Sequence, residues 1–347
     1  MRDSNIELLR GALMFMIVCV HITGNSVLTS SSPVDYNSTT WLSANIIDSF
    51  FYCCVNTFVL ISGYFGIKPF IKKFLNLEIP VIGYCFTLTV LFYFIGLTSS
   101  KFDIIQSAFP IITNRYWFLT QYAILFSISP FINTFVEGSE RKVLKRTIII
   151  GLIFVVLFPS FTCGKISFAN IRGMDFVNFS LLYLIGRYIS KYGLQFSLKK
   201  SLSYYLVSSS LCLILTVLLA YGLGINKGWQ SPFYAYNNIL VYIQSIACFF
   251  IFKNIKLQSK IINYLSPSFF YIYIIHDNPI VNDYLYTWLE CSRYTGWGYL
   301  FYTLVIAIVI FIVCLTIDIL LRRTIFSKLT EKVVCFVDSK IQKVLNR

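Results

Sequence analysis

The chain has 347 residues, of which 57% are apolar and only 13% are charged, and its formal net charge is +14. A soluble globular chain has about 45–50% apolar and about 25% charged residues, so this composition excludes a disordered protein, a disulfide-stabilised secreted scaffold and an ordinary cytosolic enzyme. It predicts a polytopic membrane protein without a separate soluble domain of ordinary size.

Continuous apolar runs recur along the chain, most of them near the length of about 20 residues that an α-helix needs to cross a bilayer. The strands of a membrane barrel would instead alternate in polarity over about 10 residues. We therefore predict an all-α, polytopic membrane helix bundle with about ten transmembrane helices, of which the fifth and sixth are short. In chain order, the predicted spans are residues 6–28, 44–66, 75–98, 116–136, 147–162, 176–190, 203–223, 235–252, 262–281 and 298–321.

The basic residues fall mainly on one side of this arrangement. Of the 29 Lys and Arg residues, 23 lie in the two terminal segments and the even-numbered connections, and 6 lie in the odd-numbered connections. Because Lys and Arg gather in the cytoplasmic loops of membrane proteins, both termini are predicted to be cytoplasmic. The same rule explains the positive net charge without a nucleic-acid partner.

The last segment of the chain, residues 326–347, is basic and amphipathic. Apolar residues such as Val333, Phe336 and Ile341 are interspersed with lysines. We predict a membrane-embedded domain over residues 1–325, followed by this cytoplasmic tail. Two placements of the tail are open: on the anionic inner leaflet, or in solvent.

The cysteines give no sign of a disulfide framework or a metal site. Ten of them are scattered through the chain, with no Cys-x-x-Cys pair and no cluster at zinc-ligand spacing. We interpret them as small apolar packing residues. Two histidines without partner cysteines or clustered carboxylates make a poor ligand set, so no metal is predicted.

Both histidines of the chain, His21 and His276, fall inside predicted spans. Ionisable side chains inside a membrane are costly and usually functional. His21 follows Arg10 by eleven residues, so the two share a helix face about 16 Å apart along the axis. His276 has a similar predicted depth on another helix, so the two imidazoles can meet across one cavity. Asp277 comes next and, as a helical neighbour, is expected to point elsewhere. On position alone, hydrogen-bonded packing of each histidine between helices is an equal alternative.

Two further features lie near the predicted cytoplasmic face. Ser62 and Gly63 come near the inner end of the second span, where a glycine lets another backbone approach closely. On position alone, simple helix packing is the favoured interpretation of this pair. Lys72 and Lys73 follow in the next connection and place two cations at the same face.

These motifs resemble, in order, those of the acyltransferase-3 family, whose members are integral membrane acyltransferases that often O-acetylate cell-surface polysaccharides. The family has an Arg-x10-His first helix, a Phe-Phe-x-x-Ser-Gly helix, a Trp-Phe-Leu segment that leads to Ser-Pro, and a late Tyr-Leu-Ile-His motif. The similar segments here are residues 5–11 with His21, residues 55–64, residues 116–130 and residues 273–276.

The chain also departs from the family pattern. Thr57 replaces one aromatic residue of the Phe-Phe pair. The second cytoplasmic loop often carries an Arg-rich stretch before a proline, whereas Asn76 and Leu77 stand at that place here. A catalytically inactive family member is therefore one alternative.

The resemblance implies transfer of an acyl group, expected to be acetyl, from acyl-CoA to a hydroxyl of a cell-surface or lipid-linked glycan. Acyl-CoA is then a donor substrate, and no permanently bound cofactor is expected. His21 would act as general base or as covalent acyl carrier. His276 would orient a substrate or act as a second acid/base. The residues expected to bind the donor are Arg10, Ser62, Gly63, Lys72 and Lys73, whose cations suit the CoA phosphates.

An alternative from another class is a transporter or flippase of a glycan, or a transporter of the acyl group without transferase chemistry. Transporters often have internal repeats and helices broken near the bilayer midplane. The two halves of this sequence show no convincing repeat, which favours the enzyme. The expected location is the cell membrane (inner or plasma membrane), with membrane lipids, acyl-CoA and the glycan acceptor as partners.

The orientation rule gives a direct prediction. A reporter domain fused after Arg347 is expected to be cytoplasmic, because the C-terminal segment carries the largest group of basic residues. Protease protection in intact and permeabilised cells measures this. Cleavage of the reporter from outside intact cells would contradict the predicted topology.

Overall fold

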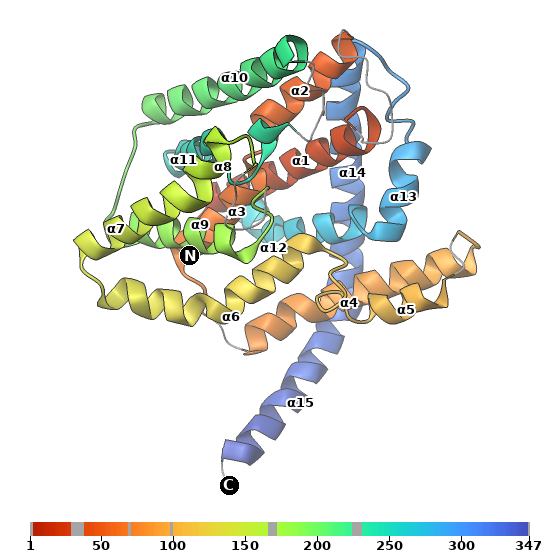
Figure 1. Ribbon diagram of the computed structural model, residues 1–347. Coiled ribbons are helices and arrows are strands. Elements are labelled where there is room, and N and C mark those ends of the chain that lie inside the picture. Colours follow the sequence, from red (N-terminus) through yellow and green to blue (C-terminus); the bar gives the residue numbers. More distant parts are fainter. Residues whose placement is uncertain are drawn as a thin grey trace.

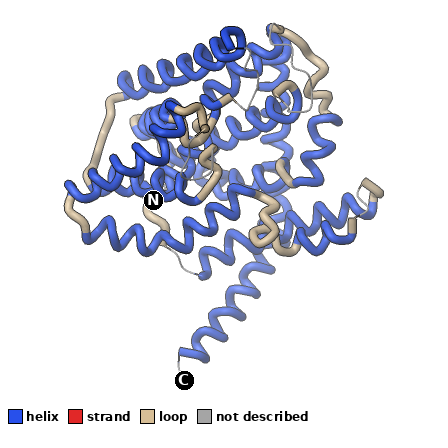
Figure 2. Tube along the Cα trace, in the orientation of Figure 1, coloured by secondary structure: helices blue, strands red, loops and turns tan. Residues whose placement is uncertain are grey.

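The computed structural model describes residues 3–28, 38–68, 71–97, 100–165, 172–223 and 231–345. Within these ranges every regular element is a helix, and Figure 2 shows helices joined by loops without a strand. The predicted all-α class is confirmed. The elements are α1 (Ser4–Ser26), α2 (Thr39–Phe51), α3 (Cys54–Phe65), α4 (Ile71–Phe94), α5 (Lys101–Ser107), α6 (Trp117–Gly138), α7 (Arg141–Gly151), the π-helix η1 (Leu152–Leu157), α8 (Phe158–Phe161), α9 (Phe176–Lys191), α10 (Leu198–Leu223), the 3-10 helix η3 (Pro232–Tyr234), α11 (Ile239–Lys253), α12 (Lys260–His276), α13 (Pro279–Trp288), α14 (Trp297–Leu321), the π-helix η4 (Arg322–Phe326) and α15 (Ser327–Leu345).

In the described part of the chain, eight helical stretches are long and apolar enough to cross a membrane. The other two predicted spans correspond to α9 and α12, whose 16 and 17 residues fall below the 18-residue length of those eight. A polytopic helical bundle is therefore confirmed. The count of ten and the cytoplasmic termini stay predictions.

The second predicted span, residues 44–66, is interrupted in the structure. It begins earlier, at Thr39, and a turn at Tyr52 and Cys53 divides it into α2 and α3. The Gln244 amide of α11 donates hydrogen bonds to the backbone carbonyls of Ser49 and Phe50, at 2.8 and 3.0 Å. An interrupted helix inside a bilayer needs such partners, because no water is present to satisfy its carbonyls.

The ninth predicted span, residues 262–281, is too long. In the structure α12 ends at His276, and a separate helix, α13, begins at Pro279. Local chemistry favours the new start: Pro279 has no backbone N–H to donate, and in the first turn of a helix that N–H would have no partner within the helix. The side chain of Asn278 caps α13 by accepting a hydrogen bond from the backbone N–H of Ile280, at 3.2 Å.

Helices α3 and α9 approach each other through two glycines. A Cβ atom on Gly63 would clash with the backbone of Tyr183, and a Cβ on Gly186 would lie 2.5 Å from the carbonyl oxygen of Leu60. Small residues at such a crossing allow backbone-to-backbone packing between membrane helices. This contact fixes the position of α3, which lines the cavity described below.

The C-terminal segment continues the last apolar helix. Helix α14 runs through η4 into α15 without a loop, and α15 projects from the other helices in Figure 1. Both η4 and α15 contact α4, and the Phe326 ring at the end of η4 meets the Tyr84 ring of α4 at a centroid distance of 4.8 Å. The division at residue 325 and the placement of the tail stay predictions, and residues 346–347 lie outside the described ranges.

The glycine contact predicts a stability change. Gly186→Ala is expected to lower the free energy of unfolding by about 1–3 kcal/mol, because the added methyl group overpacks the α3–α9 crossing. Thermal unfolding of the detergent-solubilised protein measures it. Gly222→Ala on α10 is the matched control, since a Cβ there meets nothing within 4 Å. Equal stability of the two variants would contradict the interpretation.

Candidate functional site

The two histidines are in direct contact. The Nδ1 atom of His21 on α1 lies 3.0 Å from the Nε2 atom of His276 at the end of α12. His276 is completely buried, whereas 23% of the His21 side chain is exposed. The structure thus brings together the imidazoles that the sequence placed at a similar depth. Their catalytic role stays a prediction.

A close helix contact makes this meeting possible. Helix α1 packs against α12, and a Cβ atom on Gly11 would lie 3.0 Å from the Phe269 ring. A larger residue at Gly11 would push the two helices apart. The histidine contact, ten residues further along α1, depends on this approach.

Asp277 is close to His21, contrary to the sequence expectation that it points elsewhere. Its Oδ1 atom lies 3.4 Å from the Nδ1 atom of His21 and accepts a hydrogen bond from the Asn282 amide at 2.9 Å. The expectation assumed that the helix continues past His276. Since α12 ends there, helical angles do not apply to Asp277. The signal that could have revealed this was the Asn278–Pro279 pair.

The hydrogen bonds define the proton positions on the neutral imidazoles. The Nδ1 atom of His276 lies 2.6 Å from the carbonyl oxygen of Ile272, which can only accept, so Nδ1 carries the proton. The Nε2 atom of neutral His276 is then an acceptor, and His21 donates to it from Nδ1. This assignment leaves the Nε2 atom of His21 unprotonated. That nitrogen is the one available for proton transfer.

A partly open cavity adjoins His21 and offers about 400 Å³ of space, some of it continuous with the surroundings. Its walls come from helices far apart in the sequence and are mostly apolar and aromatic. Trp117 and Tyr236 stack within it, with ring centroids 5.5 Å apart. Sequence reasoning did not assign Tyr236 to a site, since nothing in its local pattern marks it. The lining residues are Met14, Ile17, His21, Val55, Phe58, Trp117, Phe118, Tyr236, Phe270 and Tyr273.

Arg10 lies on the same stripe of α1 as the cavity residues Met14, Ile17 and His21, because these positions recur at helical spacing. Its guanidinium forms an ion pair with the buried Glu7, at 2.9 Å. Glu7 was not singled out from the sequence, although its i,i+3 spacing from Arg10 permits the pair. This stripe of α1 therefore has the Arg10 cation at one end and the His21 imidazole at the other.

Ser62 of α3 does not line the cavity but contacts α6. Its hydroxyl donates to the carbonyl of Phe58, at 3.1 Å, and lies 3.2 Å from the Tyr122 hydroxyl. The Arg10 guanidinium is within electrostatic range of Tyr122. Ser62 and Arg10 are therefore brought to one region by α3, α6 and α1.

The remaining residues expected to bind the donor lie elsewhere. Gly63 packs against Tyr183 of α9, as described above. Lys72 and Lys73 are exposed in the first turn of α4. None of these three lines the cavity.

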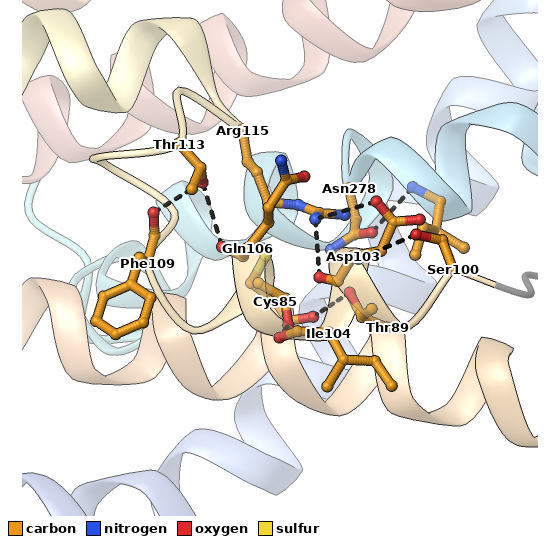
Figure 3. A network of polar contacts seen from close by, with 12 residues as sticks. Cys85, Thr89, Ser100, Asp103, Ile104, Gln106, Phe109, Thr113, Arg115 and Asn278 are labelled. Atoms are coloured by element: carbon orange, nitrogen blue, oxygen red, sulfur yellow. Dashed lines mark hydrogen bonds and ion pairs between the residues drawn. The ribbon is translucent and has the colours of Figure 1, made fainter.

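The start of α6 is held at the cavity by polar contacts. The Tyr116 hydroxyl donates to the carbonyl of Ile274 at 2.8 Å and accepts from the Asn278 amide at 3.0 Å. Figure 3 shows the neighbouring Arg115, whose side chain is 6% exposed and donates to the backbone carbonyl of Asp103 at 3.0 Å. These bonds fix the chain immediately before Trp117.

The site has no arrangement typical of a metal centre. Among the residues that the structure describes, no group of three or more His, Cys, Asp and Glu side chains is placed to hold a metal ion. The facing nitrogens of His21 and His276 are directed at each other.

Comparison with known proteins gives one match. The family model of the acyltransferase-3 family, described as an acyltransferase domain, matches residues 3–319, which is nearly the whole chain and includes both histidines. No curated protein and no solved structure shows a significant match.

Proposed function

The chain belongs to the acyltransferase-3 family and is a membrane acyltransferase, and on that premise we propose that it moves an acyl group, expected to be acetyl, from acyl-CoA to a glycan hydroxyl. The acceptor is a cell-surface or lipid-linked glycan, and the site of action is the inner or plasma membrane of the cell. The contact between His21 and His276 beside a partly open cavity is the observation that carries the proposal.

His21 is the general base. Its Nε2 atom accepts the proton of the acceptor hydroxyl while the hydroxyl oxygen attacks the thioester carbonyl carbon. When the carbon–sulfur bond breaks, the imidazolium returns this proton to the departing CoA thiolate. The products are an O-acyl ester and CoA, and His21 regains its neutral form.

His276 and Asp277 support this cycle. His276 accepts a hydrogen bond from the Nδ1–H group of His21, and this bond keeps the Nε2 atom of His21 unprotonated. The Asp277 carboxylate, 3.4 Å from the same nitrogen, stabilises the imidazolium that forms. A histidine oriented by a hydrogen-bond acceptor and a carboxylate follows the logic of other acyl-transfer sites. The alternative, acyl transfer through His21 itself, would give ping-pong kinetics.

The donor is proposed to bind along the α1 stripe. Arg10 would contact a CoA phosphate near the predicted cytoplasmic side, and the thioester would reach His21 about 16 Å away along the helix. Ser62 lies beside this path. Lys72 and Lys73, exposed on α4, would add positive charge at the same side.

The acceptor would bind at the stacked rings of Trp117 and Tyr236, which offer flat apolar surfaces to a sugar ring.

The interrupted span formed by α2 and α3 is the feature that favours a transporter, because transporters often contain broken helices. In transporters, however, the carbonyls freed by a break face the substrate. Here the Gln244 side chain binds the carbonyls of Ser49 and Phe50. This difference favours the enzyme over a glycan or acyl-group transporter.

His21→Ala is expected to reduce acyl transfer by about 10²- to 10⁴-fold, because the general base is lost. Acyl-CoA-dependent transfer in isolated membranes and mass spectrometry of surface glycans measure this. His276→Ala is expected to give a smaller loss of activity, since His21 is still present as the base but its ring is no longer held in orientation. Full activity of His21→Ala protein, with normal amounts in the membrane, would refute the assignment.

Arg10→Ala is expected to raise the apparent KM for acyl-CoA by about 10- to 100-fold, with a smaller effect on kcat, because a charge-assisted contact to a phosphate is lost. Steady-state kinetics at varied donor concentration measures it. Arg141→Ala on α7 is the control, as it removes a predicted cytoplasmic cation outside the stripe. Equal KM values for the two variants would contradict donor binding by Arg10.

A further inference from the structure

Helix α6 begins in the wall of the cavity. Its first residues, Trp117 and Phe118, both line the space beside His21. The residue before them, Tyr116, has extended backbone and provides no side-chain cap. The first N–H groups of a helix have no partner within the helix and carry partial positive charge. Unsatisfied donors are therefore concentrated at this wall.

A buried hydroxyl lies at the same place. The Tyr273 side chain of α12 lines the cavity and is only 5% exposed. Its ring centroid is 6.2 Å from that of His21 and 6.3 Å from that of His276. The hydroxyl is buried and has no hydrogen-bond partner in the described structure. A buried hydroxyl without a partner is rare, because it loses its bonds to water and gains none.

The hydroxyl and the helix start converge. The Phe118 backbone N–H and the Asp277 carboxylate lie next to the Tyr273 hydroxyl, but neither has the geometry of a hydrogen bond to it. Two kinds of donor, one from a side chain and one from the backbone, thus share one side of the cavity. The imidazole of His21 lines the same space.

We propose that the Tyr273 hydroxyl and the N-terminal turn of α6 form an oxyanion hole for acyl transfer. This inference rests on the proposed acyl-transfer function and adds the group that receives the developing negative charge. When the acceptor oxygen adds to the thioester carbon, the carbonyl electron pair moves to its oxygen. Tyr273 then donates a hydrogen bond to that oxyanion and keeps its own proton. When the intermediate collapses, the carbonyl re-forms and the CoA thiolate leaves.

The arrangement matches what acyl transfer requires. A base must reach the attacking hydroxyl while separate donors reach the carbonyl oxygen. His21 supplies the first, and Tyr273 with the backbone of Trp117 and Phe118 supplies the second. The contacts that fix Tyr116 hold the helix start in place before substrate binds.

Tyr273→Phe is the direct test, since it removes one oxygen atom and leaves the ring packing intact. We expect kcat to fall by about 10²- to 10³-fold, with little change in the KM for acyl-CoA and in the shape of the pH profile. The matched control is Tyr286→Phe on α13, which removes another buried hydroxyl without a partner but does not line the cavity. It is expected to retain activity, and both variants are expected to unfold at the temperature of the wild type.

Three outcomes would overturn the assignment. One is full activity of Tyr273→Phe, and another is an equal loss in Tyr286→Phe. The third is a displaced pH profile without a loss at its optimum, which would assign the Tyr273 hydroxyl to Asp277 instead. These results are distinct from failure of the proposed function, in which the wild-type protein itself transfers no acyl group, or the His21→Ala variant transfers it fully.

Discussion

The contact between His21 and His276 organises the centre of this molecule. Two imidazoles that share one hydrogen bond inside an apolar bundle need further polar partners, because buried polar groups are costly without them. Ile272 provides a carbonyl for His276, and Asp277 provides a carboxylate near His21. The helix packing at Gly11 brings the two helices close enough for this contact. The geometry therefore depends on backbone positions as much as on the rings themselves.

Much of this architecture could be predicted from the sequence. The apolar runs gave the helices, because the length of a membrane span is set by the bilayer. The eleven-residue interval between Arg10 and His21 gave their common face, because the helical repeat is fixed. The similar predicted depth of His21 and His276 indicated that the two rings can meet, and they are in contact. These features are local or periodic, and periodicity is what a single sequence expresses.

The features that the sequence did not predict depend on where helices end and on tertiary contacts. The end of α12 at His276 is determined by the Asn278–Pro279 pair, and a hydropathy pattern continues through it. Asp277 was misplaced for that reason. The role of Gly63 against α9 could not be separated from donor binding until the position of Tyr183 was known. Tyr236 reaches the cavity through the fold and carries no sequence signal.

The start of α6 and the end of α12 meet at one place, where Tyr116 bonds to Ile274. The two helices thus present dipole ends of opposite sign to the same partly open space. A gradient of electrostatic potential runs across that space, from the backbone amides at the start of α6 toward the last carbonyls of α12. Any rearrangement of bonds that leaves negative charge at one wall and positive charge at the other is assisted by the peptide backbone, whatever side chains take part.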